Sequence, residues 1–554
     1  MKKLLTLLSF SVLLFGQDPT IARSYIPNSF VYHWSAWDAL MHFLGPLFQT
    51  RQLNSNVTGG GPAIGVYPES YNQGDGTSGI NTALSTLMGS GVCTPAITCI
   101  LVFQGKTYTA STTIIFNGSY ITMQGQNGFA DVVSSSVIGS TVINTTSSTT
   151  NQLTETGNIN SGSSCINGTL ANTQGVSQRI IGIAFTRTTP ATSGDGIYST
   201  LTCVPWFVDV TVWDSINGFH FKGVAHITMR DDWVQFSAHS NTSRNGVYFD
   251  SSSGVNGANE SSNLRGVYTG GDGSQPSNIT GFLLSGPSIA DTFLDDIEAS
   301  ATDYGIQISS TTNPSSINYA NGDIHITHAI FDGTYLSSIY INNVYGGGVP
   351  YIEIGGGYFN KGSQGVIQIN NAKSVNIHGA VIQSPGSGQT AIVITGANSG
   401  GGNISGNIMQ LTGTCVSISN SGDWNLTGNQ CKSDISGYPI GTGYVFVNSS
   451  NNNIHGNTVE GTFTYAASFD GSSTNNSATG NGWAASTILN AGSGNDFGPL
   501  GIFTVSTLPT CNTAWKGSIA QVSDALAPTF LGSLTGSSST FTPVVCNGAA
   551  WVAY

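Results

Sequence analysis

The sequence has few charged side chains. Asp, Glu, Lys and Arg make up 8% of its 554 residues, about a third of the usual ~25%. A coiled coil needs charged positions along its helices, so this composition excludes one and fits an ordinary helical enzyme poorly. The chain is 39% hydrophobic and 10% aromatic, which is too much for a disordered protein.

Basic residues are fewer than acidic residues. The chain has 15 Lys and Arg against 28 Asp and Glu, for a net charge of -13, and the basic residues form no cluster. A protein that binds a phosphate backbone needs a basic patch or stripe. We therefore expect no nucleic acid partner, and a neutral glycan suits the surface better than a polyanion does.

Long apolar runs are also missing. The longest begins after Lys2 and Lys3 and spans about a dozen residues, Leu4 to Phe15. A charged start followed by a short apolar stretch is typical of a secretory signal peptide, whereas a membrane span needs about 20 apolar residues. We predict a signal peptide over residues 1–22, cleaved after Gly16 or Ala22, and no membrane span; a buried N-terminal helix is the alternative.

The eight cysteines contain no Cys-x-x-Cys motif, which weakens zinc and thioredoxin-type interpretations. An even number is what an oxidising compartment permits, so they support export to the medium or the cell surface. We predict four disulfides between neighbours in the sequence: Cys93–Cys99, Cys165–Cys203, Cys415–Cys431 and Cys511–Cys546.

Glycine is abundant, with 72 residues, and short apolar strands alternate with Gly, Asn and Ser turns. One motif recurs at Asn376, Asn403, Asn425 and Asn453, each followed by an apolar residue, one further residue and a Gly. Steps of 22 to 28 residues are the period of a β-solenoid coil. The strands would stack about 4.8 Å apart, so asparagines would form buried hydrogen-bonded ladders, while charges would meet like charges in the next coil.

The fold predicted is all-β: a right-handed parallel β-helix with a short N-terminal helical cap and a small C-terminal β module. Residues 23–60 form the cap, because Trp34 to Gln49 has apolar residues at helical spacing and a solenoid must cover its end. The β-helix spans 61–490, a linker 491–504, and a disulfide-closed module 505–554, which would cap the solenoid, oligomerise or bind sugars.

Residues near the start of the predicted solenoid resemble the pectate lyase superfamily. The matching features are a Gly-Asp-Gly turn, a helix, a strand and a Gly-x-Tyr turn; they lie at Gly74-Asp75-Gly76, Ile80 to Leu84, Ile100 to Phe103, and Gly105 with Tyr108. The acidic pair usual after the turn is replaced by Ser78 and Gly79. Separately, the last 45 residues resemble a module found in phage- and bacterium-encoded surface proteins. The resemblance implies a β-helix that binds or degrades polysaccharide, without fixing the reaction.

Glycoside hydrolysis needs two carboxyl groups about 5 to 9.5 Å apart, which stacked coils can supply. Aligning Val210 with Ile227, an offset of 17 residues, stacks Asp214 on Asp231. In that alignment Asp232 lies beside the pair, and Trp213, Trp233 and Arg230 are candidates for substrate binding. Adjacent carboxylates would raise one pKa, as a general acid requires.

A second acidic cluster comprises Asp291, Asp295, Asp296, Glu298 and Asp303. We predict Asp295 and Asp296 as further catalytic candidates. Turn capping by aspartate is the alternative for both clusters, and no cofactor is expected, although calcium would suit these hard oxygen ligands. His325, His328 and Asp332 follow on a strand-like run.

The sequence therefore predicts an exported protein that recognises a polysaccharide or cell-surface glycan, with cleavage by hydrolysis or by lyase chemistry left open. The alternative is a non-catalytic adhesin or a tail-spike-like receptor-binding protein of a virion tail, an architecture in which a homotrimer is common.

Overall fold

The chain divides into two units, Met1–Pro62 and Ala63–Tyr554. The computed structural model describes residues 64–66, 68, 76–89, 93–94, 98–126, 140–157, 177–237, 241–251, 259–271, 273, 277–286, 289–309, 322–344, 351–360, 362–384, 388–411, 413–433, 441–483 and 488–554. The predicted signal peptide, the predicted cap at 23–60 and Cys165 lie outside these residues. The domain boundaries stay predictions.

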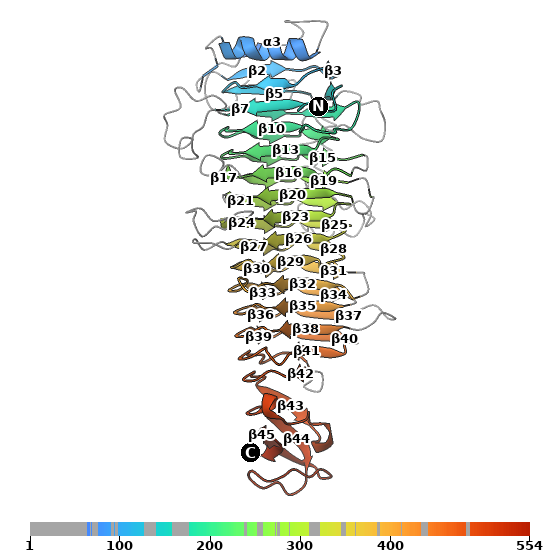
Figure 1. Cartoon of the computed structure of the whole chain (residues 1–554), viewed down its shortest axis with the longest axis vertical. Coiled ribbons are helices and arrows are strands. Elements are labelled where there is room, and N and C mark those ends of the chain that lie inside the picture. Colours follow the sequence, from blue (N-terminus) through green and yellow to red (C-terminus); the bar gives the residue numbers. More distant parts are fainter. Residues whose placement is uncertain are drawn as a thin grey trace, which may run out of the picture. The chain divides into compact units, whose positions relative to one another are not determined.

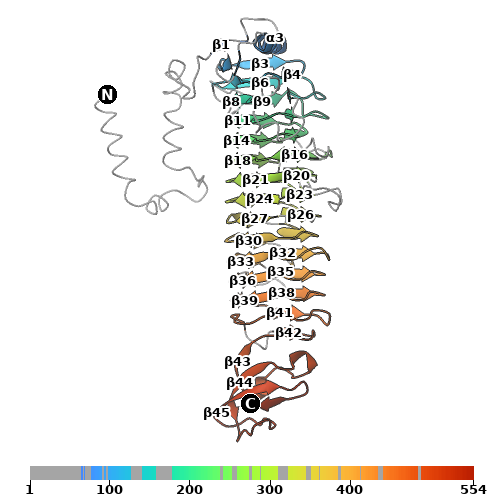
Figure 2. The same ribbon diagram turned by 90° about the vertical axis from the view of Figure 1, so that its left-hand side faces the viewer.

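The second unit contains a right-handed parallel β-helix, which confirms the predicted fold class (Figure 1). Within the described residues, each coil contributes one strand in turn to three parallel sheets, here called B, A and C, with 14, 15 and 13 strands. Figure 2 shows strands of sheet A from β11 to β39 stacked one above another.

Sheet A has 15 strands: β1 Ile64–Val66, β2 Cys99–Val102, β5 Ile121–Gln124, β8 Arg179–Ile181, β11 Trp206–Val208, β14 Thr228–Arg230, β17 Asn259–Glu260, β18 Asn263–Arg265, β21 Ile289–Asp295, β24 Gly322–Thr327, β27 Ile352–Gly355, β30 Val375–His378, β33 Asn403–Ser405, β36 Asn425–Thr427 and β39 Asn453–His455. Sheet B has 14 strands: β4 Ile114–Phe116, β7 Leu153–Thr156, β10 Ile197–Thr200, β13 Asn217–Lys222, β16 Arg244–Asp250, β20 Ile279–Ser285, β23 Tyr304–Ser309, β26 Ser337–Asn342, β29 Ile367–Asn370, β32 Thr390–Thr395, β35 Thr414–Ser419, β38 Thr442–Val447, β41 Tyr465–Phe469 and β42 Ile488–Asn490. Sheet C has 13 strands: β3 Thr107–Ala110, β6 Thr141–Thr145, β9 Ile183–Arg187, β12 Thr211–Trp213, β15 Trp233–Gln235, β19 Tyr268–Gly270, β22 Glu298–Ser300, β25 Ile330–Asp332, β28 Tyr358–Asn360, β31 Val381–Ser384, β34 Ile408–Leu411, β37 Gln430–Ser433 and β40 Thr458–Gly461.

The core is a set of apolar columns inside the coils. Side chains alternate in and out along each strand, and parallel in-register pairing stacks equivalent positions. One buried column of sheet A runs through Leu101, Met123, Ile180, Phe207, Met229, Leu264, Leu294, Ile326, Ile354, Ile377, Ile404, Leu426 and Ile454. Full burial of each such side chain stabilises the fold by roughly 1.5–3 kcal/mol.

Asparagine ladders follow the predicted repeat. Asn376, Asn403, Asn425 and Asn453 pair in register, and their amides bond along the axis at 2.8 Å (Asn403 to Asn376) and 3.0 Å (Asn425 to Asn403). This ladder is largely exposed. The buried ladder lies four positions later, where Asn429 is 1% exposed and donates to Asn457 Oδ1 at 2.9 Å.

The N-terminal helix that the structure describes is α3, Gly76–Gly89, in the segment that resembles the pectate lyase superfamily. It buries Ile80, Ala83 and Leu84. Asn81 fastens it to β4, donating to Thr113 O at 3.1 Å and accepting from Ile115 N at 2.8 Å. The helix therefore covers the first coil and satisfies part of its backbone.

A mixed four-stranded sheet follows the solenoid. Its strands are β43 Pro499–Phe503, β44 Ile519–Ala525, β45 Thr540–Cys546 and β46 Trp551–Ala553, with 3-10 turns η7 Val505–Thr507 and η8 Thr513–Trp515. The module joins the last coil through the rings of Phe497 and Trp515, whose centroids are 4.8 Å apart, and through Asn490 Nδ2, which donates to Ala514 O at 2.8 Å.

Three of the predicted disulfides are confirmed: Cys93–Cys99, Cys415–Cys431 and Cys511–Cys546. Cys203 is also disulfide-bonded, but its expected partner Cys165 lies outside the described residues. Disulfides of this kind are typical of extracytoplasmic proteins.

One carboxyl group lies inside the core. Glu155 of β7 is fully buried, and in the inward column of sheet B it stands between Phe116 and Ser199. Burial raises the pKa of Glu155 to about 8, and the neighbouring Ser199 hydroxyl only partly offsets this. At neutral pH the folded chain therefore holds Glu155 mainly as the neutral acid.

Candidate functional site

The outer face of sheet B carries a stack of rings. In-register pairing of β10, β13 and β16 places Tyr198, His220 and Tyr248 in one column. The His220 ring stacks on Tyr248, with centroids 4.6 Å apart, and lies 4.9 Å from the Tyr198 ring. His220 is therefore fixed on both sides while its side chain stays 14% exposed.

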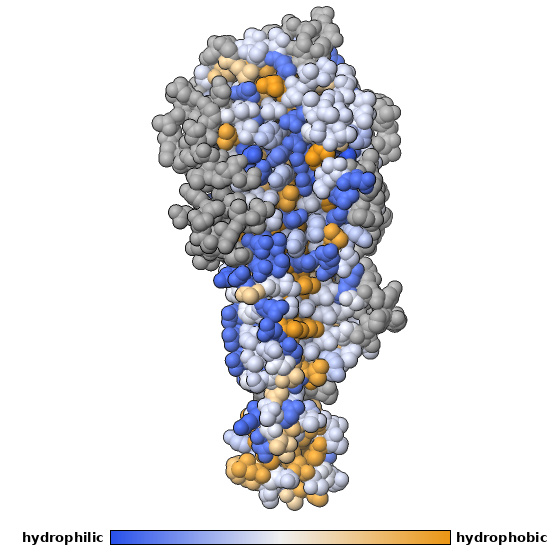
Figure 3. All heavy atoms as spheres, viewed as in Figure 1, coloured by the Kyte–Doolittle hydropathy of each residue, from blue (hydrophilic) through white to orange (hydrophobic). Residues whose placement is uncertain are grey.

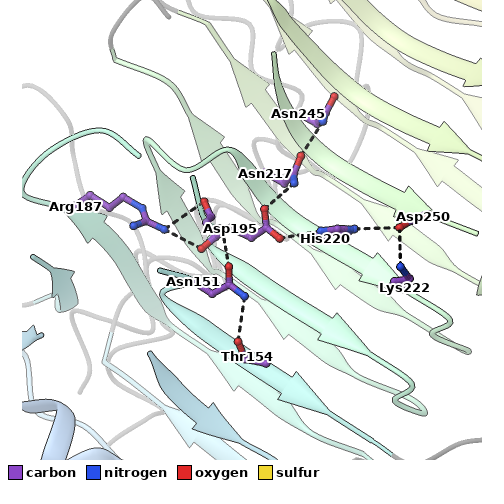
Figure 4. Close-up of polar contacts among 10 residues, drawn as sticks. Asn151, Thr154, Arg187, Asp195, Asn217, His220, Lys222, Asn245 and Asp250 are labelled. Atoms are coloured by element: carbon purple, nitrogen blue, oxygen red, sulfur yellow. Dashed lines mark hydrogen bonds and ion pairs between the residues drawn. The ribbon is translucent and has the colours of Figure 1, made fainter. Parts of the chain in front are cut away.

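Two carboxylates flank the His220 ring, one at each nitrogen (Figure 4). Asp195 Oδ2 lies 2.8 Å from Nδ1, and Asp250 Oδ2 lies 3.7 Å from Nε2. Burial lowers the pKa of His220, but the interactions with Asp195 and Asp250 outweigh it and raise the pKa above its ordinary value. The imidazole is thus poised to hold and donate a proton.

Asp195 is held in place by its neighbours. Asn217 Nδ2 donates to Asp195 Oδ1 at 2.6 Å, and Asn245 in turn donates to Asn217 Oδ1 at 2.7 Å. Asn151 accepts from the Asp195 backbone N at 2.8 Å, and Arg187 donates to the Asp195 carbonyl at 2.8 Å (Figure 4). Asp195 therefore acts as a rigid support that orients the His220 ring.

Asp250 is slightly more buried than Asp195: its side chain is 9% exposed, against 13% for Asp195. Lys222 Nζ lies 3.5 Å from Asp250 Oδ2, and the Lys222 side chain is 33% exposed. Burial, with a smaller effect of the Asp250 charge, raises the pKa of Tyr248 to about 12, so its phenol keeps its proton at neutral pH. The face thus combines an imidazole with a raised pKa, a carboxyl group, a lysine and a phenol, which are the groups that acid–base catalysis uses.

The alignment that placed Asp214 on Asp231 is wrong. Trp206 pairs with Thr228, and Thr211 pairs with Trp233, so this coil has 22 residues rather than 17. An offset of 17 also preserved the strand alternation, but it aligned a strand of sheet C with one of sheet A. Asp214 instead accepts hydrogen bonds from Ser237 N at 2.7 Å and Ser237 Oγ at 2.5 Å, which tie it to the next coil.

Asp231 and Asp296 occupy the corner between sheets A and C. From β8 onward the corner residue adopts a left-handed conformation, with φ of 55° at Asp231, 64° at Gly266 and 53° at Asp296. Aspartate tolerates this conformation better than most residues. The two predicted acids therefore share one corner, two coils apart, and a turn-forming role explains their residue type.

Asp232 is buried directly after the corner. Its carboxylate accepts from Val210 N at 2.8 Å and Arg230 N at 3.0 Å. Asn407 makes the equivalent contact to Ala380 N, so Asp232 stands at the position that the buried asparagine ladder fills later. Burial raises the pKa of Asp232 well above its usual range.

Asp295 is half-buried, with its side chain 39% exposed. It accepts from Thr327 Oγ1 at 2.8 Å and lies 2.9 Å from His328 Nδ1 and 3.8 Å from Arg265. Burial raises the pKa of Asp295, but the hydrogen bonds from His328 and Thr327 outweigh this and lower it overall. It is therefore a stable carboxylate at neutral pH.

The predicted binding residues lie on two sheets. Trp233 contacts Tyr268 on sheet C, with ring centroids 3.8 Å apart, while Trp213 aligns with Gln235 and does not stack on Trp233. Arg230 on sheet A is 61% exposed and pairs with Asp231 at 3.2 Å. Glu298 follows Tyr268 in the sheet C column, and burial, with the charges of Asp332 and Asp296, raises its pKa to about 7.

A histidine pair on sheet A shares one carboxylate. His325 Nδ1 lies 2.6 Å from Glu353 Oε2, and His378 Nε2 lies 2.9 Å from Glu353 Oε1. The Phe293 ring stacks on His325 at 4.8 Å. The hydrogen bonds with His378 and His325 lower the pKa of Glu353. Both histidines are thus satisfied by a neighbouring coil.

Asp195, His220 and Asp250 were not among the residues predicted from the sequence. The available signal was the alternation Phe219-His220-Phe221-Lys222, which matches Val247-Tyr248-Phe249-Asp250 in the next coil. Side chains alternate along a strand, so the buried rings of Phe219 and Phe221 imply that His220 between them points outward.

Over the described part of the chain, no group of three or more His, Cys, Asp or Glu side chains is arranged to hold a metal ion. None of the helices in that same part has the length and apolar character needed to cross a membrane.

No family model matches the sequence, and no curated protein matches it. Solved structures share the fold at low identity. The A-module of the mannuronan C-5 epimerase AlgE6 from Azotobacter vinelandii is 12% identical, with a TM-score of 0.41 over 77% of this chain and 97% of that one. A mutant tailspike protein of E. coli bacteriophage HK620 in complex with a hexasaccharide is 9% identical, with a TM-score of 0.43 over 75% of each chain. DFA-IIIase from Arthrobacter chlorophenolicus A6 in complex with GF2 is 10% identical, with a TM-score of 0.35 over 77% of this chain and 96% of that one. These similarities concern the fold and carry no argument about the reaction.

Proposed function

We propose that the protein is an exported polysaccharide-recognising β-helix that cleaves glycosidic bonds at the outer face of sheet B. The observation that carries the proposal is the His220 ring held between Asp195 and Asp250 and between two tyrosines. Cleavage of a glycosidic bond uses a proton donor and a proton acceptor. In this proposal His220 takes the donor role that a carboxyl group has in most glycosidases, and Asp250 is the carboxylate partner.

The remainder of the sheet B face supports binding of an extended, neutral glycan. Beyond Tyr248 and Asp250, two outward columns continue down the sheet without any Asp, Glu, Lys, Arg or His. They run through Leu283, Gln307, Tyr340, Gln368, Val393, Ser417 and Val445, and through Ser285, Ser309, Asn342, Asn370, Thr395, Ser419 and Val447. Amides and hydroxyls bind sugar hydroxyls, while the absence of cations disfavours a polyanion.

The chemistry divides between the groups around His220. The protonated imidazole donates its proton to the leaving oxygen of the glycosidic bond, and Asp195 fixes the ring for that transfer. Asp250, near Lys222, accepts a proton from the attacking water in hydrolysis. In elimination it would accept the proton of a sugar carbon next to a carboxyl group, which only a uronic-acid glycan supplies. Both outcomes use the same residues, so the product distinguishes hydrolase from lyase.

The test measures reducing-sugar release and unsaturated-product absorbance over a panel of neutral and acidic polysaccharides. We expect His220→Gln and Asp250→Asn to lose activity by about 10²- to 10⁴-fold while still binding the glycan. His455→Gln is the matched control, because His455 is an exposed histidine on sheet A. Circular dichroism confirms that each variant is folded.

Asp231→Asn and Asp295→Asn are assayed alongside, because these acids remain candidates from the sequence. Full activity in the His220 and Asp250 variants would refute the site on sheet B, and loss only in Asp231→Asn or Asp295→Asn would move it to the corner. Glycan binding without any turnover in the native protein would indicate the adhesin or receptor-binding alternative.

A further inference from the structure

The C-terminal module exposes large apolar side chains at a higher density along the chain than the solenoid does. Of the 14 large apolar side chains that are exposed among the described residues, seven lie between residues 502 and 554: Ile502, Ile519, Leu526, Phe530, Leu531, Phe541 and Tyr554. Figure 3 shows apolar residues gathered on this module. Soluble monomers rarely expose large contiguous apolar patches without a function for them.

Most of these side chains share one face of the four-stranded sheet. Along β44 and β45 the residues alternate, so that Ala520, Val522 and Val544 are buried while Ile519 and Phe541 point outward. Ladder pairing aligns Ile502 with Gln521, and Gln521 with Pro543. We call this outward side of the sheet the apolar face.

The chain terminus extends the apolar face. Tyr554 N donates to Pro543 O at 2.8 Å, so the last residue continues the row across the sheet. The Phe530 ring lies 6.3 Å from the Tyr554 ring. Phe530, Phe541 and Tyr554 are 73%, 59% and 64% exposed, and at 150–250 Å² each they present roughly 400 Å² of aromatic surface.

Charge decides which partner suits the apolar face. Residues 499–554 contain one Lys, Lys516, and one acid, Asp524, and Asp524 accepts a hydrogen bond from Val505 N at 2.6 Å. A strongly charged surface repels its own copy, whereas an uncharged sheet face meets a copy of itself without repulsion. In a symmetric homo-oligomer each copy presents the same module, so this self-complementarity is the property required.

The exposed area of the apolar face is also large enough for a protein–protein interface. A standard interface buries about 800 Å² per partner. The three aromatic side chains supply about half of that area, and the exposed side chains of Ile502 and Ile519 add to it. Full burial of such aromatic and aliphatic anchors is the usual source of interface affinity.

We propose that the apolar face of the C-terminal module binds further copies of this chain and assembles the protein into a homo-oligomer. The interface involves the module sheet and leaves the outer face of sheet B free for glycan. This assignment is independent of the catalytic proposal, because it uses none of the same residues.

The experiment is sedimentation or light-scattering mass measurement of the full chain at micromolar concentration. We expect the native protein at a multiple of the single-chain mass of 57.5 kDa, and Phe541→Asp or Ile519→Lys near the single-chain mass. Ile408→Asp is the matched control, because Ile408 is an exposed apolar residue on sheet C, away from the proposed glycan face, and it should keep the native mass.

Two substitutions on separate strands protect the test against a folding defect, and thermal unfolding of each variant checks for one. A native protein that is monomeric throughout, or an oligomer that persists in both folded variants, overturns the proposal. A monomer that loses glycan binding in Phe541→Asp would also overturn it and assign the apolar face to sugar binding instead.

Discussion

Replacing the buried Glu155 with glutamine should make the protein more stable, and increasingly so as the pH rises. The folded state raises the pKa of Glu155 from 4.5 to about 8. Below pH 4.5 the carboxyl is protonated in both the folded and unfolded states. Between these pH values the unfolded chain loses the proton and the folded chain keeps it, so stability falls as the pH rises and levels off above about 8.

The magnitude follows from the shift. At 1.36 kcal/mol per pKa unit, a pKa rise from 4.5 to about 8 corresponds to about 5 kcal/mol of lost stability at alkaline pH. The unit Ala63–Tyr554 has an unfolding entropy of about 1 kcal/mol/K if it unfolds as one body. Glutamine keeps the volume and cannot ionise, so Glu155→Gln should melt about 5 °C higher than the native protein at pH 9.

The assay is a calorimetric melting series from pH 4 to pH 9, which gives the difference in melting temperature between each variant and the native chain. Glu460→Gln is the control, because the Glu460 side chain is 51% exposed and pairs with Lys432 at 3.6 Å. The difference for Glu155→Gln should grow between pH 4.5 and 8, while that for Glu460→Gln stays small. A constant difference for Glu155→Gln over this range would refute a buried, neutral Glu155.

Two further predictions concern the ladders and the histidine pair. Asn429→Ala should lower the free energy of unfolding by about 2–4 kcal/mol, because it leaves the buried backbone groups of Asn407 and Ile404 without their hydrogen-bond partner. Asn425→Ala in the exposed ladder should lower it by about 0.5 kcal/mol or less. Equal losses in denaturant titrations would contradict the distinction between a buried and an exposed ladder. Because the folded state lowers the pKa of Glu353, this carboxylate stabilises the fold above its unfolded pKa of 4.5, and the stabilisation is lost as the pH falls through the folded pKa. Glu353→Gln should therefore lower the melting temperature at pH 6 but not at pH 3. An equal loss at both pH values would argue against the ion pairs with His325 and His378.

The period of the asparagine motif was enough to predict the fold. Each motif contains an asparagine followed by an apolar residue, whose side chain must point into the core. Aligning the apolar residues of successive motifs therefore predicts that Asn376 lies beside Asn403 and Asn403 beside Asn425, as the strand register shows. Cys415 and Cys431 are separated by 16 residues, which is less than one coil, so their disulfide could be predicted from the sequence.

The candidate site was harder to predict because the earlier coils have no such motif. Between Thr228 and Asn263 the step is 35 residues, and between Trp206 and Thr228 it is 22. Period-two alternation fits several registers equally well, so it could not exclude the offset of 17. His220 and Asp250 come from different coils and Asp195 from a turn, and only the true register brings them together.

The left-handed corner between sheets A and C forms one column of the solenoid in which residues can be substituted at low cost. At Gly406 and Gly428 an added Cβ atom would meet no other atom within 4 Å, so a side chain there would cost only the strain of a positive φ, about 1–2 kcal/mol. Asp231, Asp296 and His328 show that the corner already accepts polar residues in earlier coils. Successive coils could therefore carry chosen ligands at intervals of about 4.8 Å, while the apolar core beneath them stays unchanged.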